Sequence, residues 1–266
     1  MLMRVLFLAD VVGSPGRYAL KVLSSLSAEL KADFCIANGE NAAGGFGLTR
    51  PIAEEFFSLG VHVITSGNHL WDRREATELV AEEPRVLRPA NYPPGVPGLG
   101  AGVFTARNGS RVAVLNLLGR VFMKEVDCPF RCAEEAVERL RSETPVIVVD
   151  VHAEATSEKV ALGWFLDGKV SAVVGTHTHV QTADERILPK GTGYITDAGM
   201  TGPFDSVIGI EKEAAIQRFL SQTPVRLVPA KLDVRINGVI LDIEPTTGVC
   251  THIERLSRRA NVGEEK

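Results

Sequence analysis

The chain has 266 residues, of which 45% are hydrophobic and 23% charged, so it can bury a sizeable core. Its 29 Lys and Arg against 33 Asp and Glu leave a formal charge of −4, and we expect no strong binding to nucleic acid or to a membrane surface. The N-terminal apolar run is far shorter than the roughly 20 residues of a membrane span. Four cysteines are too few for a disulfide framework, so we expect a cytoplasmic protein.

Short runs rich in Val and Ile alternate with segments of helical periodicity, which is typical of an α/β fold with mostly buried strands. The predicted strands are 4–9, 34–37, 61–65, 111–117, 146–151, 172–175 and 193–196. The predicted helices are 17–31, 51–59 and 132–141, where apolar residues recur every three or four positions.

The last part of the chain has a different pattern. After Pro224 apolar and polar residues alternate, and Asn237-Gly238 and Thr247-Gly248 are typical hairpin turn pairs. We therefore expect a C-terminal antiparallel meander joined to the α/β core. No composition shift marks a domain boundary, so the prediction is one domain over 1–257 and a polar tail over 258–266.

Polar side chains gather at the carboxyl ends of the predicted strands, where open α/β sheets bind their ligands. These residues are Asp10, Glu40, Asn41, Asn68, His69, His152, His177 and His179. An Asp in such a place is often only a turn former and a single His is often structural, but here four of the six histidines share this location. Carboxylate, amide and imidazole groups form a mixed nitrogen and oxygen set that suits Fe, Mn or Zn. His177 and His179 are spaced to serve two neighbouring metals, so a dinuclear centre is predicted.

These motifs resemble the calcineurin-like metallophosphoesterases, and within them the YmdB-like branch. The matching segments are Asp10, Gly39-Glu40-Asn41, Gly67-Asn68-His69, Val151-His152 and Gly175-Thr176-His177-Thr178-His179. The superfamily pattern begins Asp-x-His, whereas Val12 stands at the histidine position here, and in the YmdB-like branch the asparagine after the glutamate takes that role. The loop from Asn41 to Gly47 and the segment from Asp197 to Gly202 also resemble this branch.

The resemblance implies a four-layer α/β/β/α sandwich and two divalent or mixed-valence metal ions per subunit, iron or manganese first and zinc as a further option. It implies one metal held by Asp10, Glu40, Asn41 and His179, and a second held by Glu40, Asn68, His152 and His177. Bound metals acidify water enough to supply hydroxide near neutral pH and neutralise an in-line transition state. His69 is then the natural general acid for the leaving alkoxide, because imidazole titrates near neutral pH.

The resemblance implies hydrolysis of phosphodiesters, namely 2′,3′-cyclic and also 3′,5′-cyclic nucleotides. The metal ligands alone would serve a phosphomonoesterase of broad specificity equally well, and a metal-bound regulatory protein with vestigial catalysis is a third reading. We also expect a homo-oligomer, on the family architecture and the apolar residues around Phe122, Met123 and Phe130.

Two smaller features have two readings each, and two further histidines have one. The glycines at 44, 45 and 47 form either a flexible loop or a set of backbone amides for a substrate phosphate. Asp150 either ends a strand or orients the metal ligand His152. His62 and His252 are expected to be structural.

Overall fold

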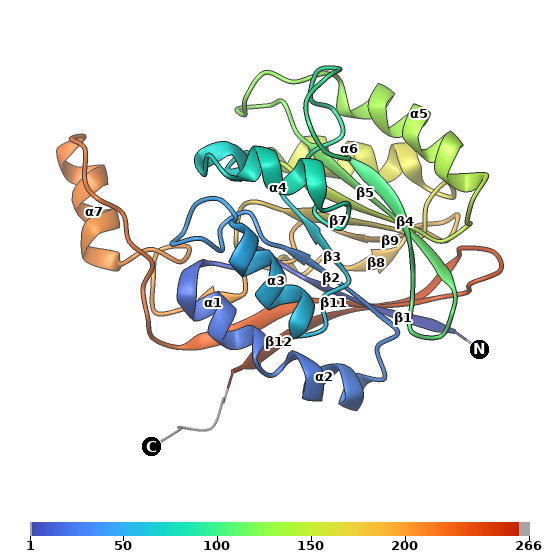
Figure 1. Ribbon diagram of the computed structural model, residues 1–266, viewed down its shortest axis with the longest axis horizontal. Coiled ribbons are helices and arrows are strands. Elements are labelled where there is room, and N and C mark those ends of the chain that lie inside the picture. Colours follow the sequence, from blue (N-terminus) through green and yellow to red (C-terminus); the bar gives the residue numbers. More distant parts are fainter. Residues whose placement is uncertain (1, 261–266) are drawn as a thin grey trace.

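The computed structural model describes residues 2–260 and contains two six-stranded sheets that pack face to face, with helices on both outer faces (Figure 1). The first sheet contains β10 (Gly202–Pro203), β11 (Val234–Ile243), β1 (Met3–Leu8), β2 (Phe34–Asn38) and β3 (Val63–Thr65) in that order, with β12 (Cys250–Arg259) paired to β11. The second contains β4 (Ala101–Thr105), β5 (Arg111–Leu118), β6 (Ile147–His152), β7 (Ala172–Thr176), β9 (Gly193–Ile195) and β8 (Arg186–Ile187).

Three layers of buried apolar side chains hold this sandwich together. In β1, Val5 and Phe7 point between the sheets, whereas Leu6 and Leu8 point toward the helices, as the two-residue period of a strand requires. The helices that cover the first sheet are α1 (Gly13–Leu20), α2 (Leu23–Leu30), α3 (Arg50–Ser58) and α4 (Ala76–Glu82). The second sheet is covered by α5 (Pro129–Arg141) and α6 (Thr156–Leu166). The predicted α/β/β/α sandwich is therefore confirmed.

The seven predicted strands are present with ends shifted by one or two residues, but two of the predicted elements are wrong. The expected helix over 17–31 is two helices, because Lys21 and Val22 turn the chain through bonds to the carbonyls of Tyr18 and Ala19. The apolar spacing misled the prediction because both helices bury leucines against the same sheet.

Asn237-Gly238 is not a hairpin turn either, since it lies inside β11 opposite Leu8. A Cβ at Gly238 would overlap the carbonyl oxygen of Phe7, so the glycine permits close strand contact instead of a turn. Thr247-Gly248 does form the turn between β11 and β12, and the C-terminal strands join the first sheet antiparallel as expected.

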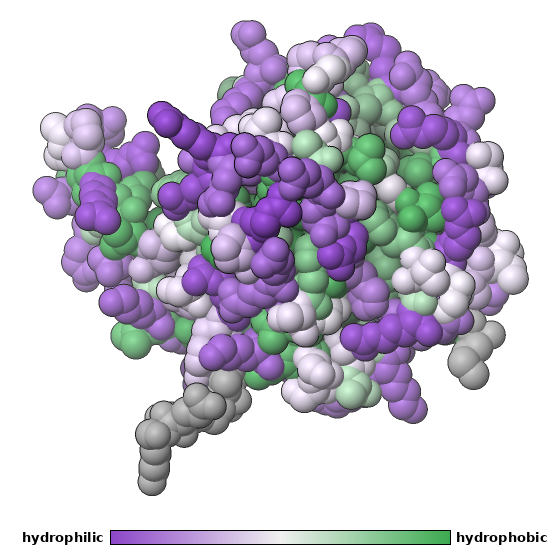
Figure 2. Space-filling view, in the orientation of Figure 1, coloured by the Kyte–Doolittle hydropathy of each residue, from purple (hydrophilic) through white to green (hydrophobic). Residues whose placement is uncertain are grey.

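β12 extends to Arg259, two residues into the segment predicted as a polar tail, and 261–266 lie outside the described residues. The prediction missed β4, β8, β10, α4, α6 and α7 (Lys212–Ser221). Helix α7 stands apart from the sandwich, and polar and apolar side chains alternate on its visible face (Figures 1 and 2). Within residues 2–260, no helix is long and apolar enough to cross a membrane.

Candidate metal centre

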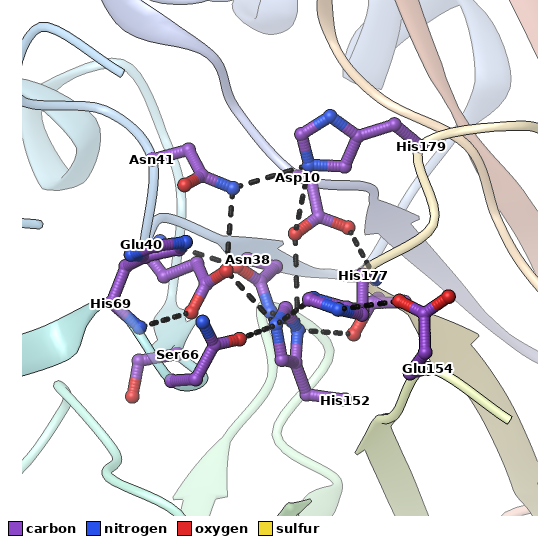
Figure 3. Close-up of polar contacts among 12 residues, drawn as sticks. Asp10, Asn38, Glu40, Asn41, Ser66, His69, His152, Glu154, His177 and His179 are labelled. Carbon is purple, nitrogen blue, oxygen red and sulfur yellow. Dashed lines mark hydrogen bonds and ion pairs between the residues drawn. The ribbon is translucent and has the colours of Figure 1, made fainter. Parts of the chain in front are cut away.

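Five parallel strands from both sheets deliver the predicted ligands to one place (Figure 3). Asp10, Glu40 with Asn41, and Asn68 follow β1, β2 and β3 of the first sheet, whereas His152 ends β6 and His177 follows β7 of the second. All seven predicted ligands and His69 lie at this edge. The polar residues that the sequence separates by more than 160 positions therefore share one site.

Three of these side chains converge at the buried Nε2 atom of His152. Glu40 Oε1 lies 2.9 Å from it, Asn68 Oδ1 3.1 Å and His177 Nδ1 3.0 Å. Ligand atoms of Glu40, His152 and His177 all lie within 4.8 Å of one another, close enough to hold one cation. These four residues are the set expected for one of the two metals.

The second expected set lies on the other side of Glu40. Asn41 Nδ2 is 3.3 Å from Glu40 Oε1 and 3.2 Å from His179 Nε2, which in turn is 3.8 Å from Asp10 Oδ1. Rotation of the Asn41 amide exchanges its nitrogen and oxygen, so the same position can present an oxygen ligand. Glu40 contacts both sets, as a bridging carboxylate must, and Asp10 also reaches the first set through His152 and the backbone N–H of His177.

Asp10 provides the test of whether this site suits a cation. Its side chain is fully buried, and Oδ1 has no hydrogen-bond partner in the described chain. Burial raises the pKa of Asp10, an effect that His179 and His152 oppose. A buried carboxylate oxygen without a partner is costly, and a bound cation would supply the missing contact. The donor set therefore fits metal ions.

The pKa directions at the other ligands have the same cause. Burial lowers the pKa of His177 to about 3, and the charge of His152 adds to this, so the imidazole is neutral as ligation requires. Burial alone would lower the pKa of His152, but Glu40 outweighs it and raises that pKa. Burial alone would likewise raise the pKa of Glu40, but His152 outweighs it and holds that pKa low. Without a metal, a proton on His152 balances the charge of Glu40.

His152 is oriented from behind by a buried relay. The Thr176 hydroxyl donates to Asp150 Oδ1 at 2.7 Å, so its oxygen accepts from His152 Nδ1 at 2.9 Å. This bond leaves His152 Nε2 facing Glu40. The Thr65 hydroxyl also donates to Asp150, and burial raises the pKa of Asp150 to about 6. Asp150 therefore orients His152 through Thr176, in agreement with the second of its two readings.

His69 lies at the rim of the site, where its ring is partly exposed. Its Nδ1 atom is 2.8 Å from Asp72 Oδ2, and its backbone N–H donates to Glu40 Oε2 at 3.0 Å. A carboxylate accepts, so Nδ1 carries the hydrogen and Nε2 is the atom left for another partner. The Phe46 ring packs edge-on against His69, with 4.9 Å between centroids.

Comparison with known proteins identifies the family to which this chain belongs. A model of the YmdB-like protein family matches residues 6–256. The chain belongs to the YmdB-like family. It is 50% identical to the 2',3'-cyclic-nucleotide 2'-phosphodiesterase of Bacillus subtilis (strain 168), over 96% of each chain.

Two solved structures of this YmdB-like fold are similar. A hypothetical protein from Thermus thermophilus is 41% identical, with a TM-score of 0.91 over 97% of this chain and 100% of the other. A novel phosphatase from Mycoplasma pneumoniae is 34% identical, with a TM-score of 0.90 over 97% of this chain and 94% of the other. The metallophosphoesterase-type fold is thus shown.

The YmdB-like turn that carries His177 and His179 is held by a buried ion pair that the sequence prediction missed. Both histidines have left-handed backbones, with φ of +97° and +64°. Asp197 Oδ2 accepts from the backbone N–H of Thr178 at 3.0 Å, from its hydroxyl at 2.6 Å and from Lys159 Nζ at 2.8 Å. A lysine within an apolar helix was the available signal, since such a residue is rarely buried without a partner.

His179 is fixed by a backbone group for which no sequence signal exists. The carbonyl oxygen of Ile208 lies 2.9 Å from His179 Nδ1, and because a carbonyl only accepts, Nδ1 carries the hydrogen. Nε2 therefore faces Asp10 and Asn41. Ile208 has a φ of +45°, which is uncommon for a β-branched residue.

The glycine loop is ordered by an arginine. Arg73 Nε donates to the Phe46 carbonyl at 3.0 Å, and another of its nitrogens donates to Ala43. The amides of Gly44 and Gly45 donate to Ala42 and Asn41 within the loop, so they are not available to a phosphate. Arg73 braces the loop that was read as flexible, and the phosphate-binding reading stays a prediction for the amide of Gly47.

The two remaining histidines lie away from the centre, as expected. His62 Nδ1 accepts from the Cys35 amide at 3.1 Å and its ring packs on Phe34. His252 lies on β12 beside Glu254.

Proposed function

We propose that this YmdB-like chain is a metal-dependent phosphodiesterase that hydrolyses 2′,3′-cyclic nucleotides, with 3′,5′-cyclic nucleotides as a secondary substrate. The observation that carries the proposal is the bare, buried Oδ1 of Asp10 beside a converging set of neutral and acidic ligands. The name of the Bacillus subtilis relative supplies the substrate class.

The proposed ligands of one metal are Asp10, Glu40, Asn41 and His179, and those of the other are Glu40, Asn68, His152 and His177. Iron or manganese is the expected pair, with zinc as a third candidate, because the ligands mix nitrogen and oxygen donors. Two bound metals supply positive charge for the phosphoryl oxygens and a water that is acidic enough to react near neutral pH. Most ligands are neutral, so the loaded site attracts an anionic diester although the chain is acidic.

His69 is proposed to supply the proton that the reaction needs. Water adds to phosphorus and releases one proton to solvent, the bond between phosphorus and the 2′ oxygen breaks, and His69 Nε2 protonates that oxygen as it leaves. The product is a nucleoside 3′-phosphate, and the imidazole takes up a proton from solvent to complete the cycle. Asp72 holds Nδ1, which turns Nε2 outward for this task.

The test is a substrate panel on protein reconstituted with Mn²⁺ or Fe²⁺, with metal content measured in every sample. We expect His69→Ala to keep its metals and to lose about 10²- to 10⁴-fold in kcat toward a 2′,3′-cyclic nucleotide. The exposed His252→Ala is the matched control and should keep full activity. Full activity of His69→Ala would exclude His69 as the general acid.

The same panel decides between the proposal and its two alternatives. A preference for nucleoside monophosphates over cyclic nucleotides would favour a phosphomonoesterase. Tight binding of two metals without hydrolysis of any phosphoester would favour a regulatory protein. The cytoplasmic location and the homo-oligomer stay predictions.

A further inference from the structure

An open cavity of about 550 Å³ lies between the glycine loop and the segment that follows α7. Phe46 lines it from the loop, and Arg218, Gln222, Thr223 and Leu227 line it from the other side. This volume is within the range of about 300–1,000 Å³ that is usual for small-molecule sites. None of the residues proposed as metal ligands lines the cavity, so it is a separate compartment.

Phe46 connects this cavity to the proposed catalytic histidine. Its ring packs against His69 at 4.9 Å between centroids, while the same residue lines the cavity. The backbone that carries this ring is also braced, because Arg73 Nε donates to the Phe46 carbonyl at 3.0 Å. An aromatic side chain on a braced loop is a preorganised surface for stacking.

Arg218 gives the opposite wall a cationic group. It lies in the last turn of α7 and is exposed. Within residues 2–260 its guanidinium has no hydrogen-bond or ion-pair partner, so its donors are available to a ligand. A guanidinium both stacks on aromatic rings and donates to carbonyl oxygens and ring nitrogens.

We propose that this cavity is the nucleobase subsite of the enzyme, in which the base stacks on Phe46 and contacts Arg218. The inference rests on the proposed function. In a 2′,3′-cyclic nucleotide the base is on C1′, the carbon next to the one whose oxygen His69 protonates. A ring in contact with His69 is therefore within reach of the base. Stacking accepts any base, so this subsite favours nucleotides over other cyclic phosphodiesters without strong base selectivity.

The test compares 2′,3′-cyclic AMP with glycerol 1,2-cyclic phosphate, which has the same reacting ring and no base. We expect Phe46→Ala and Arg218→Ala each to raise KM for the nucleotide about tenfold. The same variants should leave kcat/KM for the base-free diester within about twofold, which shows that His69 is undisturbed. Phe46→Tyr should restore the KM for the nucleotide, because it keeps the ring.

Phe219→Ala is the matched control, since Phe219 is also a phenylalanine of this region but lines the neighbouring apolar cavity instead. It should change neither substrate. Equal losses on both substrates, or no loss on either, in Phe46→Ala and Arg218→Ala would overturn the subsite.

Binding of the product provides a readout that does not need turnover. Calorimetry with adenosine 3′-phosphate should show about tenfold weaker binding to Phe46→Ala, with glycerol 2-phosphate unchanged. If the unmodified protein hydrolysed neither diester, the proposed function would fail. The difference in adenosine 3′-phosphate binding would still show whether the cavity binds the base. Equal binding of adenosine 3′-phosphate to both proteins would then exclude the subsite.

Discussion

The Nδ1 atom of His69 lies 2.8 Å from the Oδ2 atom of Asp72, three residues further along the chain. This pair is a consequence of the short helix η1 (Leu70–Asp72), which turns the carboxylate back toward the histidine. Asp72 thereby holds Nδ1 and leaves Nε2 as the nitrogen that would face a substrate of the proposed reaction.

Asp72→Asn tests that arrangement. The amide keeps a hydrogen-bond acceptor but removes the charge, so we expect kcat for a 2′,3′-cyclic nucleotide to fall about tenfold. Bis-p-nitrophenyl phosphate should be much less affected, because its leaving group departs without a proton. Steady-state kinetics on both substrates measures the difference. Glu75→Gln, an exposed carboxylate nearby, is the control, and equal losses on both substrates would argue against a role in proton delivery.

Lys159→Met should weaken both folding and metal binding. The side chains of Lys159 and Asp197 are almost fully buried, so removal of the ammonium leaves an unpaired carboxylate, which costs about 3–5 kcal/mol. Asp197 also holds the Thr178 turn, so the metal content that depends on His177 and His179 should fall as well. Urea unfolding and metal analysis give the two readouts.

Two further variants control for simple loss of charge in this experiment. Lys231→Met removes an exposed lysine and should change stability by no more than about 0.5 kcal/mol. The double variant Lys159→Met/Asp197→Asn should recover part of the stability, because no charge remains buried alone. A single variant as stable as the parent chain would show that the pair does not hold the turn.

The location of the proposed ligands could be predicted, because it follows from the order of the strands along the sequence. Asp10, Glu40 and His152 each stand directly after or at the end of a run of apolar residues, and parallel strands bring such ends together. The groups that orient them could not be predicted in the same way. Lys159 lies on α6 and pairs with Asp197, which is distant from it in the sequence. His179 is held by the backbone carbonyl of Ile208, and because every residue has such a carbonyl, the sequence does not single it out.

The errors in the fold have a related cause. Local signals such as Asn237-Gly238 and the leucines of 17–31 are compatible with more than one structure, and the sheet contacts decide between them. Helix α7 was missed although Ile216, Phe219 and Leu220 have the three- and four-residue spacing of a helical face, and this face is exposed instead of packed on a sheet.

Gly67→Ala should abolish metal binding with little effect elsewhere. A Cβ at this position would overlap the His152 ring and the Glu40 carboxylate, the two groups at the middle of the site. We expect loss of bound metal and of activity, measured by metal analysis and by hydrolysis of a cyclic nucleotide. Gly109→Ala is the comparison: its φ of +85° costs alanine about 1 kcal/mol, yet a Cβ there meets nothing within 4 Å. Retention of both metals in Gly67→Ala would contradict the proposed ligand geometry.

Cys35 is expected to make the protein less stable as the pH rises into the alkaline range. Its side chain is buried in β2, and burial raises the pKa of the thiol to about 12. In the unfolded chain a thiol ionises near pH ~8.5. Between these values the unfolded state loses the proton and the folded state keeps it, so stability is full below about pH 8.5 and falls as the pH rises. The slope is about 1.4 kcal/mol per pH unit, or about 2 kcal/mol between pH 8.5 and 10.

Cys35→Ala should remove this part of the slope although it lowers stability at neutral pH through the lost packing. Urea unfolding at several pH values from about 7 to about 10 compares the two chains, and only the difference between their slopes is attributed to Cys35. Cys128→Ala is the control, because the pKa of that partly exposed thiol is lowered by backbone N–H groups at the start of α5. The Cys128→Ala chain keeps Cys35, so its stability should still show the alkaline decrease assigned to Cys35. Parallel curves for the parent chain and Cys35→Ala would mean that the thiol ionises equally well in the folded protein.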